Sequence, residues 1–219
     1  MNFNQTNFKS LTGAALFTLL ISIFMLSFES CKKEKADPLA SPKYDQLNTA
    51  MQKLWSDHMY WTLSTVEAFF HNPDALNDNL TRLLQNQKDI GAAIVPYYGQ
   101  AAGDTLAALL TEHIQLAVPV LTAAKNNDNT AVGAAVANWK KNAKDIADFL
   151  SAANPNNWPA SVTESALEHH IDHTVEYSVD ILNNNYTDAN ATFEHALEHM
   201  LGVATTLSEG IAKQFPSKF

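Results

Sequence analysis

Histidine is the residue type with the most obvious potential for chemistry in this chain, which contains eight of them. Five lie in the last quarter of the sequence, where two H-x-x-x-H pairs, His169 with His173 and His195 with His199, flank an asparagine-rich segment at residues 183–188. Neutral imidazole is a common ligand of zinc, copper and iron. Zinc proteases use the same spacing as H-E-x-x-H, which neither pair contains. The pairs alone are therefore a weak indication of a metal site.

Helices must position these side chains, because apolar residues recur at helical spacing from residue 44 onwards and no segment alternates as a strand would. We expect long helices over residues 44–70, 100–125, 130–152, 160–182 and 188–213, a shorter one over 75–86, and a loop at 95–99. Turns rich in Asn, Pro and Gly join them. The predicted fold is all-α, an antiparallel bundle of about five long helices plus short helices around a four-helix-bundle-like core.

The predicted helices over residues 160–182 and 188–213 form a C-terminal helical hairpin. Two histidines outside this hairpin lie on the apolar stripes of their helices. His58 follows Leu54 by four residues, and His113 follows Leu110 by three. Both fall near the middle of a predicted helix, and mid-helix positions of neighbouring antiparallel helices lie at similar heights. A buried imidazole needs partners. We therefore expect a polar layer across the middle of the bundle.

On the two hairpin helices, His170 and His199 lie closest to the apolar faces, so they are the expected contributors to this layer. The predicted ligands of a transition metal, copper, zinc or iron, are His58, Glu112, His113, His170 and His199, with Asn142, Asp145 and Glu194 as groups that orient them. The remaining hairpin histidines, His169, His173 and His195, are expected on helix flanks or at the surface.

Three classes of function remain open on these residues. The first is a binding protein that holds a metal or a metal-bearing ligand. The second is a structural or partner-binding protein whose polar layer is metal-free and only fixes helix register. The third is a metal-dependent enzyme of unspecified reaction. No E-x-x-H ligand pair, glycine-rich phosphate loop or haem-attachment motif occurs in the sequence.

The N-terminal residues predict export. Residues 11–26 form an uncharged apolar run that ends shortly before the single cysteine, Cys31. This resembles the leader of a bacterial lipoprotein, which implies a signal peptide over residues 1–30, a lipidated Cys31 with a flexible tether over residues 31–43, and a helical domain over residues 44–219. A plain secretory leader or an uncleaved anchor are the alternatives. All three place the domain outside the cytoplasm. The lipoprotein interpretation also makes the membrane a partner, through the N-terminal lipid anchor, with the domain facing the periplasm or at the cell surface.

Nucleic acid is not an expected partner. The formal net charge is −9 and no cluster of Lys and Arg lies on any predicted helix face, so phosphates would be repelled.

Several segments resemble a group of small, largely uncharacterised bacterial helical proteins. They are WxxHxxW at residues 55–61, LTEH at 110–113, NxxDIAxFL at 142–150 and SEGIAKQFP at 208–216. Members of that group sometimes carry an acetylglutamate kinase label, which no glycine-rich or strand-helix pattern in this sequence supports. The resemblance implies that the following residues occupy the group's pattern positions: His58, Glu112, His113, Asn142, Asp145, His170 and His199. His169, His173 and His195 do not occupy positions of that pattern.

Overall fold

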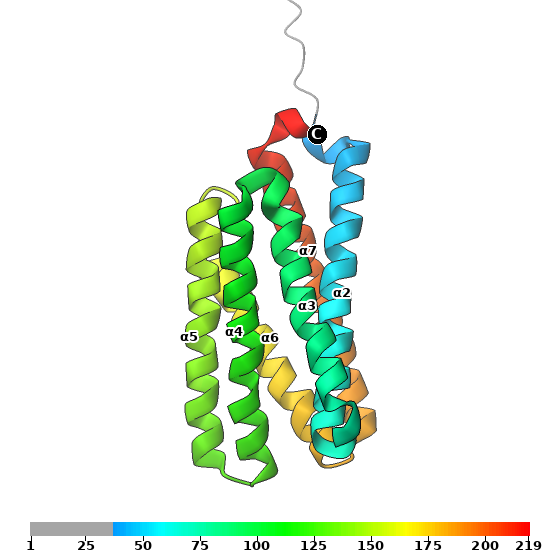
Figure 1. Cartoon of the computed structure of the whole chain (residues 1–219). Helices are drawn as coiled ribbons and strands as arrows, with labels where there is room; N and C mark the ends of the chain where they lie inside the picture. The colour runs from blue at the N-terminus through cyan, green and yellow to red at the C-terminus, as the bar shows by residue number, and fades with distance from the viewer. Residues whose placement is uncertain (1–36) are drawn as a thin grey trace, which may run out of the picture. The chain divides into compact units, whose positions relative to one another are not determined.

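The computed structural model describes residues 37–219, which fold into an all-α bundle as predicted (Figure 1). The long helices of this part are α2 (Pro42–His71), α3 (Pro73–Tyr98), α4 (Gln100–Lys125), α5 (Asn129–Ala153), α6 (Ala160–Leu182) and α7 (Tyr186–Gln214). Two short 3-10 helices, η1 (Pro38–Ala40) and η2 (Pro216–Lys218), lie near its ends.

The helices form a closed ring in which each packs against the next and α7 returns to α2. Helix α6 departs from this simple order, since it runs obliquely behind α3 and α4 (Figure 1) and contacts both α2 and α4 as well as its sequence neighbours. Side chains on the inner face of α6 can therefore meet side chains from α2 and α4.

Short turns hold successive helices antiparallel. A single residue, Asn72, separates α2 from α3, and Gly99, with φ of 84°, separates α3 from α4. Asn127 and Asn184 adopt φ of 56° and 61° in the two following tight turns. Glycine and asparagine tolerate this left-handed conformation better than other residues, which explains why these residues occupy the turns.

One predicted boundary was wrong. Residues 75–86 were expected to form a short helix and residues 95–99 a loop, but α3 continues unbroken to Tyr98. Pro96 lies within the last turn, where its missing N–H removes one helical hydrogen bond, and the helix ends only two residues later. The bundle therefore contains one more long helix than expected.

Helix α2 begins at Pro42, slightly before the predicted start of the domain at residue 44, and Ser41 caps it by accepting a hydrogen bond from the Tyr44 amide. The predicted signal peptide and Cys31 lie outside the described residues. Within the described part, α4 is the one helix long and apolar enough to cross a bilayer by length and composition. It packs between α3 and α5.

Helices α3 and α4 approach each other closely at Gly91 and Gly103. A Cβ atom placed at Gly103 would lie 2.7 Å from the carbonyl oxygen of Gly91, and one placed at Gly91 would overlap the carbonyl oxygen of Gly103. Only hydrogen fits at these two positions. The close approach follows directly from the one-residue turn at Gly99.

Candidate functional site

Three histidines from three helices meet in the middle of the bundle. His58 on α2, His113 on α4 and His170 on α6 are exposed by only 2, 3 and 2 %. The ring centroid of His170 lies 5.4 Å from that of His58 and 5.9 Å from that of His113. The Nε2 atoms of His58 and His170 are 3.4 Å apart. We call these residues the histidine triad, and its convergence follows from the position of α6 between α2 and α4.

Two amides orient the outer rings of the triad. The Asn142 Oδ1 oxygen lies 2.8 Å from His113 Nδ1, so His113 Nδ1 donates and His113 Nε2 carries no proton. The Gln87 side-chain nitrogen donates to the Leu83 carbonyl at 2.9 Å and lies 3.2 Å from His58 Nδ1, which therefore accepts. His58 Nε2 then carries the proton that it donates toward His170 Nε2.

Gln87 was missed by the sequence analysis although it is fully buried. The predicted helix ended at residue 86, one position before it. A longer pattern was available, since Leu83, Gln87, Ile90 and Ile94 follow one another at steps of four, three and four residues. A glutamine on such a stripe is a signal of a buried hydrogen-bonding partner.

Several buried polar atoms around the triad have no hydrogen-bond partner: His113 Nε2, His170 Nδ1, Gln87 Oε1 and the indole nitrogen of Trp139. A cavity of about 150 Å³ adjoins them, lined by the three triad histidines, Trp139 and otherwise mainly apolar side chains. An unpartnered buried polar atom costs about 1–3 kcal/mol. The region around the triad thus contains several buried polar atoms without hydrogen-bond partners, inside an otherwise apolar core.

Burial keeps all three imidazoles neutral at physiological pH. It lowers the pKa of His58 to about 3, helped by the nearby His113, and the pKa of His113 to about 4. Burial also holds the pKa of His170 well below its usual value, with His58 and His113 adding to the effect. Neutral imidazole is the form that binds metals.

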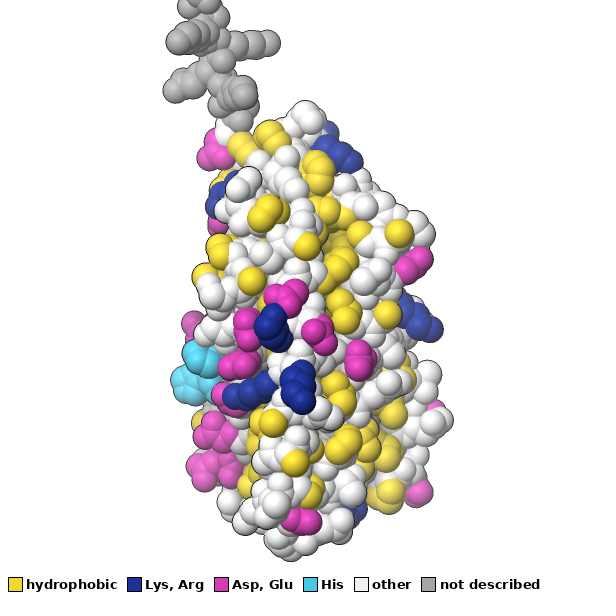
Figure 2. All heavy atoms as spheres, turned by 90° about the vertical axis from the view of Figure 1, so that its left-hand side faces the viewer, with side chains coloured by type: hydrophobic (Ala, Val, Ile, Leu, Met, Phe, Trp, Pro, Cys, Tyr) yellow, Lys and Arg dark blue, Asp and Glu magenta, His cyan; other side chains and the backbone are white. Residues whose placement is uncertain are grey.

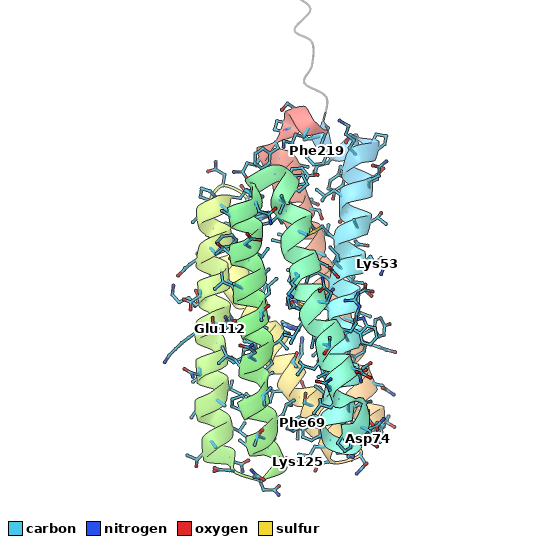
Figure 3. All side chains as sticks on the ribbon, in the orientation of Figure 1. Lys53, Phe69, Asp74, Glu112, Lys125 and Phe219 are labelled. Atoms are coloured by element: carbon cyan, nitrogen blue, oxygen red, sulfur yellow. The ribbon has the colours of Figure 1, made fainter. Side chains whose placement is uncertain are left out.

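The predicted carboxylates do not join the triad. Glu112 (labelled in Figure 3) is exposed on α4, one residue from His113 and on a different side of the helix. Asp145 on α5 and Glu194 on α7 are also exposed. Residues adjacent to an inward-facing position point about 100° away around a helix. Of the predicted orienting groups, only Asn142 contacts a triad histidine.

His199 lies in a different group. Its Nε2 donates to the Ala166 carbonyl at 2.8 Å, and its ring lies 6.2 Å from that of His169 and 6.0 Å from that of His173. His169 and His195 are exposed and His173 is half-buried. Figure 2 shows histidine side chains projecting at the edge of the molecule beside acidic ones. The hairpin histidines other than His170 therefore form a surface group on α6 and α7.

As they stand, residues 37–219 contain no group of three or more His, Cys, Asp or Glu side chains arranged to hold a metal ion. The triad offers two nitrogens at close range, on His58 and His170, and a third, His113 Nε2, whose ring is nearly parallel to that of His170 with an interplanar angle of 21°. It could hold an ion only if a ring turned.

Replacing Asn142 with leucine tests the orienting bond. Asn142→Leu removes the acceptor for His113 Nδ1 and leaves both ring nitrogens of a buried histidine without partners, so we expect the free energy of unfolding to fall by about 1–3 kcal/mol. Urea unfolding monitored by circular dichroism measures it. The exposed neighbour Asn138, changed to leucine on the same helix, is the control and should have an effect within about 0.5 kcal/mol. Equal effects of the two substitutions would contradict a structural role for this bond.

No protein-family model, curated protein or solved structure matches this chain, so its function must be argued from the site itself.

Proposed function

We propose that the bundle binds one transition-metal ion at the histidine triad, in an exported and membrane-anchored protein. The observation that carries the proposal is the convergence of three buried, neutral imidazoles from α2, α4 and α6. His113 Nε2 has no partner, and the Nε2 atoms of His58 and His170 lie against each other. Zinc, copper and iron all accept imidazole ligands. The exported location rests on the N-terminal sequence alone.

The separation of the first two nitrogens supports this assignment. Two nitrogens bound to one tetrahedral zinc ion at about 2.0–2.1 Å lie about 3.3–3.4 Å from each other. His58 Nε2 and His170 Nε2 are 3.4 Å apart. They can therefore share an ion with little movement of the helices that carry them.

The tautomer of His58 must change when the ion binds. Its Nε2 proton has to move to Nδ1, which then needs an acceptor in place of the Gln87 amide nitrogen. Gln87 Oε1 has no partner, and rotation of the amide would bring it to Nδ1. The imidazole stays neutral throughout, so binding at neutral pH releases no net proton from His58.

His113 would supply the third ligand. Its Nε2 carries no proton and its Nδ1–H is held by Asn142, the arrangement in which a hydrogen bond to one nitrogen leaves the other free for a metal. The adjoining 150 Å³ cavity gives the ring room to turn and has space for water as a further ligand. Three histidines and a water match a common open zinc site.

A metal-free polar layer is the competing interpretation, because Gln87 and Asn142 already satisfy one nitrogen each on His58 and His113. That interpretation leaves His113 Nε2 and Gln87 Oε1 unpaired, whereas the proposed site engages both of them. A layer that only fixed helix register would be expected to pair its members, since an incompletely satisfied network is worse than an apolar core.

Calorimetric titration of metal-stripped protein, purified without a histidine tag, tests the proposal with zinc, copper and cobalt salts. We expect one equivalent of tightly bound ion in the unaltered chain. His113→Gln and His170→Gln should each weaken binding at least about 100-fold, since each removes a ligand. Thermal unfolding of each variant verifies that it is folded.

The matched control is the surface group. The double variant His169→Gln, His195→Gln removes two exposed imidazoles and leaves the triad intact, so it should retain the stoichiometric ion. Absence of binding to the unaltered chain, or loss of binding only in the surface variant, would contradict the proposal. The first result favours the metal-free polar layer, and the second an adventitious surface site.

A further inference from the structure

A second and larger cavity lies on the other side of the triad. Its volume is about 530 Å³, and side chains from all six long helices line it, among them Met51, Ile90, Leu110 and Ile146. Cavities of about 300–1,000 Å³ with mainly apolar walls are typical of small-molecule sites. Protein cores are otherwise close-packed, so an apolar space of this size is a distinct feature of this bundle.

The cavity reaches the surface between α6 and α7. Val162 on α6 lines it and is 58 % exposed, and His195, Glu198 and Gly202 on α7 line it and are also exposed. An exposed valine at the rim of an apolar cavity is consistent with an entrance. The charged and exposed lining residues therefore lie at the opening, and the deeper lining is mainly apolar.

One buried hydrogen-bond donor in the lining has no partner. Trp55 is 5 % exposed, and its indole Nε1–H has no hydrogen-bond partner. Indole nitrogen is a donor only, so a ligand that satisfies it must carry an acceptor. Two other buried side chains of the lining carry donors, and both are satisfied. Thr163 donates to the backbone carbonyls of Pro159 and Ala160, and the Trp158 indole donates to the Thr206 carbonyl. Among the buried side chains that line the cavity, Trp55 is thus the one with an unpaired donor.

Charge limits the ligand further. The exposed Glu198 carboxylate lies at the opening, and the chain has a formal net charge of −9. An anionic ligand would be repelled at the entrance, and no carboxylate lines the interior to pair with a cation. Burying an unpaired charge in such surroundings is strongly unfavourable.

We propose that this cavity binds an uncharged, elongated, mainly hydrocarbon molecule with a single hydrogen-bond acceptor, such as a carbonyl oxygen, directed to Trp55 Nε1. Its aliphatic part fills the space between Met51, Ile90 and Leu110, and the molecule enters between α6 and α7. The site is separate from the metal site proposed above and does not depend on it.

Fluorescence of N-phenyl-1-naphthylamine and its displacement by decan-2-one provide the test on the folded chain. We expect decan-2-one to compete at lower concentration than decanoate or decylamine. Stronger binding of either charged compound would overturn the proposed ligand class. Failure of the fluorophore and the ketone to bind at all would overturn the site.

Two glycines supply a matched pair of variants. A Cβ at Gly202, on the cavity wall, or at Gly133, on the exposed face of α5, would meet nothing within 4 Å. Both positions therefore accept a side chain without disturbing the fold. Gly202→Leu fills the entrance and should weaken decan-2-one binding at least about 10-fold, whereas Gly133→Leu should change it less than about 2-fold. Equal affinities for the two variants would contradict the assignment.

Trp55→Phe keeps an aromatic ring and removes only the donor. It should weaken binding of decan-2-one about 3- to 10-fold, the value of one hydrogen bond, and weaken binding of decane less. An equal loss for both ligands would show that the ring, and not the Nε1–H group, carries recognition. Trp55 packs edge-on against His58, with ring centroids 5.7 Å apart, so both ligands are measured in metal-stripped protein to keep this result separate from metal binding.

Discussion

Lowering the pH from 7.5 to 5 should reduce the free energy of unfolding of the metal-free protein by about 4 kcal/mol from His58 and His113 alone. Burial lowers the pKa of these two side chains to about 3 and about 4, whereas an unfolded histidine has a pKa of about 6.5. Between these values the unfolded chain binds protons that the folded chain does not, so stability rises with pH.

The penalty on the folded state is therefore near zero well above pH 6.5 and grows as the pH falls through 6.5 toward 4. At pH 5 each buried neutral histidine costs the folded state about 2 kcal/mol relative to the unfolded one. His170, whose pKa is lowered in the same direction, adds to the loss. Since domains of this size are stable by about 5–15 kcal/mol, the protein should approach unfolding near pH 4.5.

Urea unfolding at a series of pH values in the presence of a chelator measures this effect. His113→Leu should flatten the pH dependence by one histidine, about 2 kcal/mol at pH 5, whatever its effect at neutral pH. His195→Asn changes an exposed histidine and should leave the slope unaltered. A free energy of unfolding that stays constant between pH 7.5 and 5 would contradict the burial of neutral imidazoles.

Gly91→Ala should destabilise the bundle by about 3 kcal/mol or more. The added methyl group would overlap the backbone carbonyl oxygen of Gly103 and crowd the side chain of Ala107, and a backbone atom cannot turn aside as a side chain can. Helices α3 and α4 would have to separate, and overpacking of this kind costs about 1–3 kcal/mol even where flexible side chains relieve it.

Gly133→Ala is the control, since a Cβ at Gly133 meets nothing within 4 Å. Alanine is favoured over glycine in a helix, so this variant should gain about 0.5–1 kcal/mol. Chemical unfolding of both variants gives the comparison. Similar free energies for the two variants would show that α3 and α4 do not approach as closely as described.

Helical periodicity predicted most of the fold, and mid-helix placement on apolar stripes predicted that His58, His113 and His170 would lie together. Both inferences depend only on where a residue lies around and along its helix, which can be read from the spacing of residues in the sequence. The end of α3 was misplaced because the predicted helix stopped at residue 86, within the polar segment at residues 85–89, whereas α3 continues to Tyr98. Gln87 lies one residue beyond that predicted end and was therefore not recognised as a buried partner of His58.

The position of His199 depended on packing that periodicity does not describe. Its place at the edge of an apolar stripe allowed it to face either the core or α6, and its hydrogen bond to the Ala166 carbonyl holds it beside α6. The 530 Å³ cavity was also beyond prediction from the sequence. A cavity depends on how six helices fit together, whereas a stripe shows only which residues face inward.

Crystals grown from metal-stripped protein and soaked with cobalt or zinc, measured at the metal absorption edge, test the central claim most directly. The proposal predicts an anomalous peak bonded to His58 Nε2 and His170 Nε2 at about 2.0–2.1 Å, with His113 turned toward it. A peak only beside His169 and His199, or no peak at all, would contradict it.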